Sequence, residues 1–185
     1  MSDTPLIFNH SLQGLLSRAF PAGVPAELKA KLLTVGVDLS KPLLPAYPVH
    51  TWARCIEFSA PFAFPHERRE VAWRMLGERM IDGYQDSMIG GAMFSMLRIL
   101  GPRRMLQRAQ KNFRTGNNYS EVRATDVSPT AMDLWFNETD DVLRHFTAGL
   151  VLAGMRAGGA EEPQVELLQT DPKGVTFRAS WKPKP

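Results

Sequence analysis

The stretch VELLQTDPKGVTFRASW, residues 165–181, decides the fold class, because it has the pattern of a β-hairpin. Every second residue from Val175 to Trp181 is apolar, so one face of the second strand can be buried. The connecting Asp171-Pro-Lys-Gly174 has proline at its second and glycine at its fourth position, which suits a type I turn. The C-terminus is therefore predicted to form two antiparallel strands.

A second hairpin is expected upstream. Met132, Leu134 and Phe136 alternate with more polar residues, which indicates a half-buried strand. Residues 119–127 are its expected partner, and Ser128-Pro-Thr130 is the turn. Between the two hairpins, Asp140 opens a helix that Gly158-Gly159 ends.

The first two thirds of the chain read as helices, because apolar residues recur there at helical spacing. A stretch with three prolines, residues 37–48, is expected to be extended. The order of elements predicts one α+β domain over residues 1–185. Its N-terminal helical layer packs with a C-terminal antiparallel sheet of about four strands. Six helices are expected: from Asn9 to before Pro21, from Pro25 to Gly36, from Val49 to before Pro61, from Glu67 to before Gly83, from Tyr84 to Leu100 and from Pro102 to Arg114.

Composition and charge favour a soluble protein. The 185 residues carry a formal net charge of only +3, which does not by itself imply nucleic acid. The single cysteine, Cys55, cannot form an intramolecular disulfide, and the N-terminus lacks the pattern of a secretory signal. No apolar run is long enough to span a bilayer. We therefore expect a cytoplasmic protein.

Positive charge is concentrated between Arg98 and Arg123, where seven basic residues stand against one acid. The rest of the chain carries 15 basic and 18 acidic residues. Guanidinium groups suit phosphate and carboxylate, and the following Thr-Gly-Asn-Asn can turn backbone amides toward an anion. The alternative is a solvated helix face that makes salt bridges. The predicted anion-binding residues are Arg103, Arg104, Arg108, Arg114, Asn117 and Asn118.

An apolar pocket is the second predicted feature. Five methionines lie between Met75 and Met96, and methionine fills irregular spaces and tolerates varied ligands. The alternative is an ordinary methionine-rich core. The predicted lining residues are Trp52, Trp73, Tyr84, Met88, Met93 and Phe94.

Catalytic and metal-binding patterns are missing from the sequence. The four histidines are scattered, and no zinc spacing, nucleophile elbow, phosphate loop or dinucleotide fingerprint is present. Cys55 lies on an apolar helix face and is expected to be buried. We therefore expect no enzyme, no metal site and no cofactor.

Four motifs together resemble a known family. They are Tyr47-Pro-Val-x-Thr-Trp52, Leu76-Gly77 with Gly83-Tyr84, Gly101-Pro-Arg-Arg with Arg114-Thr-Gly-Asn-Asn-Tyr119, and Thr176-Phe-x-x-x-Trp181. The chain is similar over nearly its whole length to a paralogous family largely restricted to Myxococcales and described as a domain of unknown function. That resemblance implies no activity.

At the level of fold, the order of elements resembles the H-NOX, 4-vinyl-reductase and TRAPP-like group. In the haem-binding H-NOX branch a histidine after a Leu-Gly segment holds the iron, and a Tyr-x-Ser-x-Arg motif serves the haem propionates. The similar segment from Leu100 to Tyr119 has no histidine, and in Tyr119-Ser-Glu-Val-Arg123 glutamate replaces the serine. The resemblance therefore extends to the fold and not to haem.

These features predict a sensory or regulatory domain that binds a small or hydrophobic ligand, with an anionic group recognised by the basic helix. A protein–protein interaction module, a homodimer as the TRAPP likeness implies, is the alternative. Nucleic acid is not expected as a partner, because no base-stacking platform accompanies the basic helix.

Overall fold

A computed structural model describes the chain at residues 4–85 and 99–183. The N-terminal part is mainly helical. Its elements are β1 (Leu6–Phe8), α1 (Asn9–Ala19), α2 (Ala26–Thr34), β2 (Ala46–Pro48), α3 (Val49–Ala63) and α4 (Arg69–Gln85), with β1 and β2 paired antiparallel.

The C-terminal part is a sheet with one long helix. Residues 99–107 are helical and lead into α6 (Ala109–Phe113). Then follow β3 (Val122–Ser128), β4 (Ala131–Phe136), α7 (Asp141–Ala157), β5 (Glu161–Asp171) and β6 (Gly174–Lys182). The four strands form one antiparallel sheet in the order β3-β4-β6-β5.

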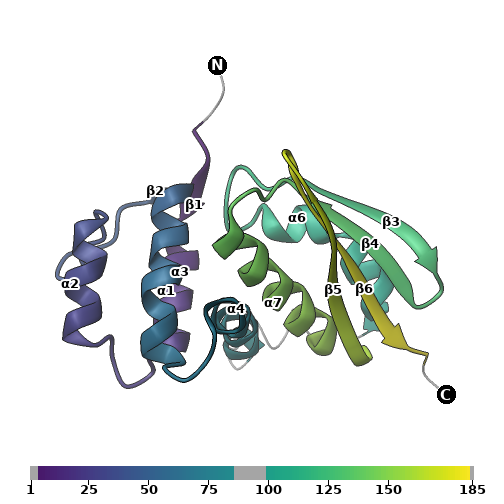
Figure 1. The fold of residues 1–185 in the computed structure, drawn as a ribbon, viewed down its shortest axis with the longest axis horizontal. Coiled ribbons are helices and arrows are strands. Elements are labelled where there is room, and N and C mark those ends of the chain that lie inside the picture. The colour runs from purple at the N-terminus through teal and green to yellow at the C-terminus, as the bar shows by residue number, and fades with distance from the viewer. Residues whose placement is uncertain (1–3, 86–98, 184–185) are drawn as a thin grey trace.

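Two layers of elements flank a central helix pair. In Figure 1, α1, α2 and α3 lie on one side and the sheet with α6 on the other, while α4 and α7 lie between them. The inner face of the sheet carries the alternating side chains that the sequence predicted, and they pack with Val151, Leu152 and Met155 of α7. Trp52 and Leu76 belong instead to a second core among the N-terminal helices.

The predicted α+β class and the four-stranded sheet are confirmed. The predicted cap is also present, since the Asp140 carboxylate accepts a hydrogen bond from the Leu143 amide at 3.1 Å. This bond satisfies one amide at the helix start that has no partner within the helix.

Three local predictions were wrong. The basic helix is not continuous to Arg114, because a turn at Arg108 separates residues 99–107 from α6. The third helix does not end before Pro61 but continues to Ala63, which leaves the proline in its last turn. The helix expected from Glu67 begins at Arg69. The segment expected to be helical from Tyr84 to Leu100 lies mostly outside the described residues.

Two glycines bring α4 and α7 into backbone contact. A Cβ atom placed on Gly77 would lie 3.0 Å from the Leu150 amide nitrogen and would overlap the Phe146 carbonyl oxygen. A Cβ placed on Gly149 would lie 3.0 Å from the Glu78 amide nitrogen and would overlap the Arg74 carbonyl oxygen. The backbones of α4 and α7 therefore lie closer together than they could if either position carried a side chain.

No helix among the described residues combines the length and apolar character needed to cross a bilayer.

Replacing either contact glycine should separate the two helices. Gly77→Ala and Gly149→Ala should each lower the free energy of unfolding by at least about 2 kcal/mol, because backbone atoms cannot move aside. Gly154→Ala on the same helix is the matched control, because its Cβ would meet only the flexible end of Met105 at 3.8 Å. That variant should change stability by less than about 1 kcal/mol. Urea unfolding followed by circular dichroism gives all three values, and equal losses at positions 149 and 154 would contradict the close contact.

Candidate functional site

A cavity of about 670 Å³ lies between the N-terminal helices and the C-terminal part. This volume falls within the range of small-molecule sites. Most of its wall is apolar, and the apolar side chains come from five parts of the chain. These side chains include Ile7 (β1), Trp52 (α3), Met80 and Ile81 (α4), Met105, Leu106 and Phe113 (residues 99–113), and Leu143, Phe146, Leu150 and Val151 (α7).

A carboxyl group and a phenol lie together in this wall. Glu138 is only 6% exposed, and its carboxyl group is hydrogen-bonded to the Tyr119 hydroxyl. Asn137 fixes their two segments together: its side chain accepts from the Glu121 amide at 2.8 Å and donates to the Tyr119 carbonyl at 3.0 Å. The carbonyl oxygen of Glu138 in turn accepts from Nε of Arg144 at 3.2 Å.

Burial determines how the pair titrates. Burial, with help from the negative charge of Asp140, raises the pKa of Glu138 to about 7, although Arg144 and the Tyr119 hydroxyl act in the opposite direction. Burial also raises the pKa of Tyr119 far above its usual range, and the Glu138 charge adds to this shift. Near neutral pH the phenol is therefore a permanent hydrogen-bond donor, while the carboxyl group exists in both charge states.

The predicted anion-binding arginines do not line this cavity. Arg103 forms an ion pair with Asp126 at 2.8 Å and donates to the Ser128 carbonyl at 3.0 Å. Arg114 donates to the Asn118 carbonyl oxygen. Arg104 and Arg108 are exposed, and their side chains form neither a hydrogen bond nor an ion pair with any described residue.

The two predicted asparagines hold backbone segments in place. The side-chain oxygen of Asn117 accepts from the amides of Tyr119 and Ser120, and its nitrogen donates to the Phe113 carbonyl at 3.2 Å. The Asn118 side chain accepts from the Leu6 amide at 2.7 Å and donates to the Thr4 carbonyl at 3.1 Å. Their amide groups are thus engaged within the chain, and the 116–118 loop is joined to β1.

Of the predicted pocket residues, Trp52 lines the cavity and meets Phe146 edge to face, with ring centroids 5.4 Å apart. Trp73 is buried elsewhere, beside His145 and beneath the Arg69 guanidinium. Tyr84 lies near the end of α4. Met88, Met93 and Phe94 lie outside the described residues.

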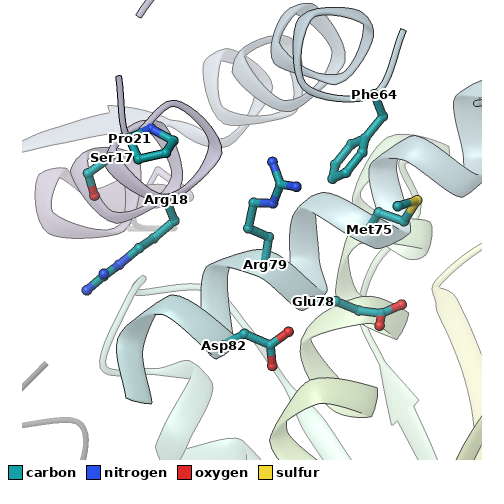
Figure 2. Close-up of a pocket in the computed structure, with 8 residues that line it drawn as sticks. All are labelled: Ser17, Arg18, Pro21, Phe64, Met75, Glu78, Arg79 and Asp82. Atoms are coloured by element: carbon teal, nitrogen blue, oxygen red, sulfur yellow. The ribbon is translucent and has the colours of Figure 1, made fainter. Parts of the chain in front are cut away.

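A second, more open pocket of about 500 Å³ shares Ser17 and Arg18 with the cavity. Figure 2 shows that Arg79 of α4 extends toward Phe64, while Arg18 of α1 extends away from it. The Arg79 guanidinium lies 4.5 Å from the centre of the Phe64 ring, and Glu78 is paired with Arg156 at 2.6 Å. Because the guanidinium groups of Arg18 and Arg79 diverge, they do not form a joint anion site.

Glu138 was not among the predicted site residues, although the sequence contains a signal for it. Met132, Leu134 and Phe136 point to the inner face of the sheet, and position 138 continues the same alternation past the end of β4. A glutamate in that register is directed inward unless the chain turns first.

The architecture defines a class of protein, the H-NOX-like α+β domains. An unliganded Fe(II) H-NOX protein from K. algicida superposes with a TM-score of 0.69 at 12% identity, covering 96% of this chain and 98% of that chain. A Cs H-NOX mutant carrying 4-cyano-L-phenylalanine gives 0.70 at 12% identity, with 96% and 97% covered. An oxygen-binding H-NOX domain related to soluble guanylate cyclases gives 0.68 at 12% identity, with 93% of each chain covered. At this identity the likeness concerns the fold alone.

The family to which this chain belongs follows from its sequence. Residues 5–182 match the family described as a protein of unknown function, DUF2378, and the chain belongs to that family. No curated protein matches it significantly in sequence.

The described lining does not fit haem. The one histidine in it, His10, is exposed and lies with Nε2 3.1 Å from the Thr115 carbonyl oxygen. Arg123, at the arginine position of the propionate motif, lies over the Trp135 ring at 4.5 Å. Tyr119, at the tyrosine position, meets the carboxyl group of Glu138, which would repel a propionate. Among the described residues no cluster of three or more His, Cys, Asp or Glu could hold a metal ion.

The raised pKa of Glu138 predicts a pH-dependent contribution to stability. A carboxyl group whose pKa rises on folding stabilises the protein fully below its unfolded pKa, near 4.5, and loses that contribution as pH rises through about 7. The unfolding free energy of the wild type minus that of Glu138→Gln should therefore fall by roughly 3 kcal/mol between these limits. Chemical denaturation across this pH range tests the difference. The exposed Glu67→Gln serves as control, and an equally pH-dependent difference for that variant would show that Glu138 is not the cause.

Proposed function

We propose that this protein is a sensory or regulatory domain that binds a small, mainly apolar molecule in the cavity between its helices and its sheet. The observation that carries the proposal is the cavity itself: about 670 Å³, with a largely apolar wall and one buried carboxyl–phenol pair. Sites for small molecules commonly have this composition, in which apolar area supplies affinity and a few polar groups fix orientation.

The fold supports a sensory role by analogy. One of the superposed structures is an oxygen-binding domain related to soluble guanylate cyclases, and its fold is shared over 93% of this chain. Fold likeness does not transfer a ligand, and the lining residues of this chain differ in kind from those that serve haem. The analogy therefore concerns the position of the ligand, between the helical part and the sheet.

Binding accounts for the cavity better than catalysis does. Cys55 is fully buried, and burial raises the pKa of its thiol to about 12, so it is no thiolate nucleophile. Tyr119 remains a protonated phenol, because its pKa is raised as well. The pair that remains, a carboxyl group bonded to a phenol, can orient a polar group of a ligand.

Recognition of an anionic group belongs to a different surface. Arg104, Arg108 and Lys111 are exposed and free of described partners, on the helical segments that precede and follow the turn at Arg108. Guanidinium groups of this kind suit the carboxylates or phosphates of a partner. Because these residues do not line the cavity, the anionic group is assigned to a partner and not to the ligand.

Occupancy of the cavity can be measured directly. Native mass spectrometry of the purified protein should show a bound small molecule, and the neutral dye Nile red should fluoresce in protein stripped of it. Leu150→Trp should abolish the dye signal, because Leu150 is part of the wall and the larger side chain fills the space. Leu168→Trp on the exposed edge strand β5 is the matched control and should leave the signal unchanged. Failure of the stripped wild type to bind Nile red or any small molecule would refute the proposal.

The basic surface has its own test. Inorganic pyrophosphate should shift the amide NMR signals of residues 104–111 in the wild type, and the shifts should vanish in Arg104→Glu/Arg108→Glu. The control, Lys29→Glu/Lys173→Glu, has the same change in net charge on other exposed surfaces and should retain them. Shifts that persist in the arginine variant would assign these residues to an ordinary solvated helix face.

A further inference from the structure

The ligand class follows from the charge that the cavity contains. We infer that the cavity accepts a molecule with a basic nitrogen on an apolar body, and that the nitrogen binds to the Glu138 carboxyl group. This inference rests on the proposed function, because it specifies the occupant of the same cavity.

The carboxyl group has free capacity on the cavity side. An ionised carboxylate can accept about four hydrogen bonds. Among the described residues the Tyr119 hydroxyl is the one side-chain donor bonded to it. The nearby Arg144 directs its Nε to the backbone carbonyl of Glu138, 3.2 Å away. Glu138 therefore lines the cavity with acceptor positions that the described chain does not use.

A ligand ammonium group supplies what this carboxylate lacks. A buried carboxylate is costly unless a positive partner and hydrogen bonds compensate for lost water, and Asp140 makes the local field still more negative. A protonated amine supplies both the charge and the donors. A ligand carboxylate in the same place would meet two negative groups, and an alcohol would gain a hydrogen bond without the charge interaction.

The rest of the wall suits the apolar body of such a molecule. Trp52, Phe113 and Phe146 contribute aromatic surface, and Met105 and Val151 contribute aliphatic surface. Aromatic faces also attract cations, so they do not oppose an ammonium group. Apart from Glu138 and Tyr119, the titratable residues in the described lining are His10 and Arg18, both on α1.

Amine affinity should depend on pH in a defined direction. The amine stays protonated well above neutral pH, whereas the pKa of Glu138 lies at about 7 in the empty protein. Binding should therefore strengthen as pH rises through about 7 and level off above it. Asp140 and Arg144 are the other charged groups that face Glu138.

Three probes of matched shape separate the possibilities: naphthylethylamine, naphthylethanol and naphthylacetate. Calorimetry at about pH 8 on stripped wild-type protein should give the amine an affinity at least roughly 30-fold above that of the alcohol, with the acid weakest. Glu138→Gln should bring amine affinity down to about that of the alcohol, because the side-chain amide can still form a hydrogen bond but carries no charge. Tyr119→Phe, which removes the phenol and retains the ring, should weaken amine binding less than Glu138→Gln does.

The outcomes distinguish this inference from the proposed function. Equal binding of amine and alcohol, or unchanged amine binding in Glu138→Gln, overturns the inference and leaves the cavity as a general apolar site. Tighter binding of naphthylacetate than of the amine also overturns the inference and makes Arg18 the main polar contact of the ligand. If none of the probes nor Nile red binds, the proposed function fails, and the inference fails with it.

Discussion

The contact between α4 and α7 is the constraint on which the rest of the structure depends. Gly77 and Gly149 each face the backbone of the opposite helix, so the two helix axes lie as close as backbone atoms allow. One helix belongs to the N-terminal helical core, while α7 also packs on the sheet. Because this contact joins the two cores, it fixes their separation, and the cavity lies where they remain apart.

A second connection closes the structure around the cavity. Asn118 binds the start of β1 through both atoms of its side-chain amide, and the Phe8 amide donates to the Gly116 carbonyl at 2.9 Å. The segment that reads as a flexible anion-binding turn is therefore a structural link between the N-terminal and C-terminal parts of the described fold. Its asparagines suit this task because a primary amide can donate and accept at once. Glu138 supplies the one carboxyl group among the described residues that line the cavity.

Local periodicity predicted the elements well and the site poorly. Both hairpins, the Asp140 cap and the layered α+β arrangement follow from residues close in sequence, such as the alternation through Phe177. Gly149 and Gly154 look equivalent in the same helix, yet only the first faces another backbone, which depends on tertiary packing. Arg103 was predicted to bind an anion, but it forms an ion pair with Asp126, which lies 23 residues later in the sequence. The expected homodimer and cytoplasmic location stay predictions.

On our proposal, one architecture can accept opposite charges in its interior. The H-NOX propionate motif serves a dianionic group, and this chain retains its tyrosine at Tyr119. Here the phenol donates to the carboxyl group of Glu138, and Arg123 lies over the Trp135 ring. Placing a carboxylate at the phenol and removing a guanidinium both make the interior more negative. The interior of this chain would therefore favour a cation on the same scaffold.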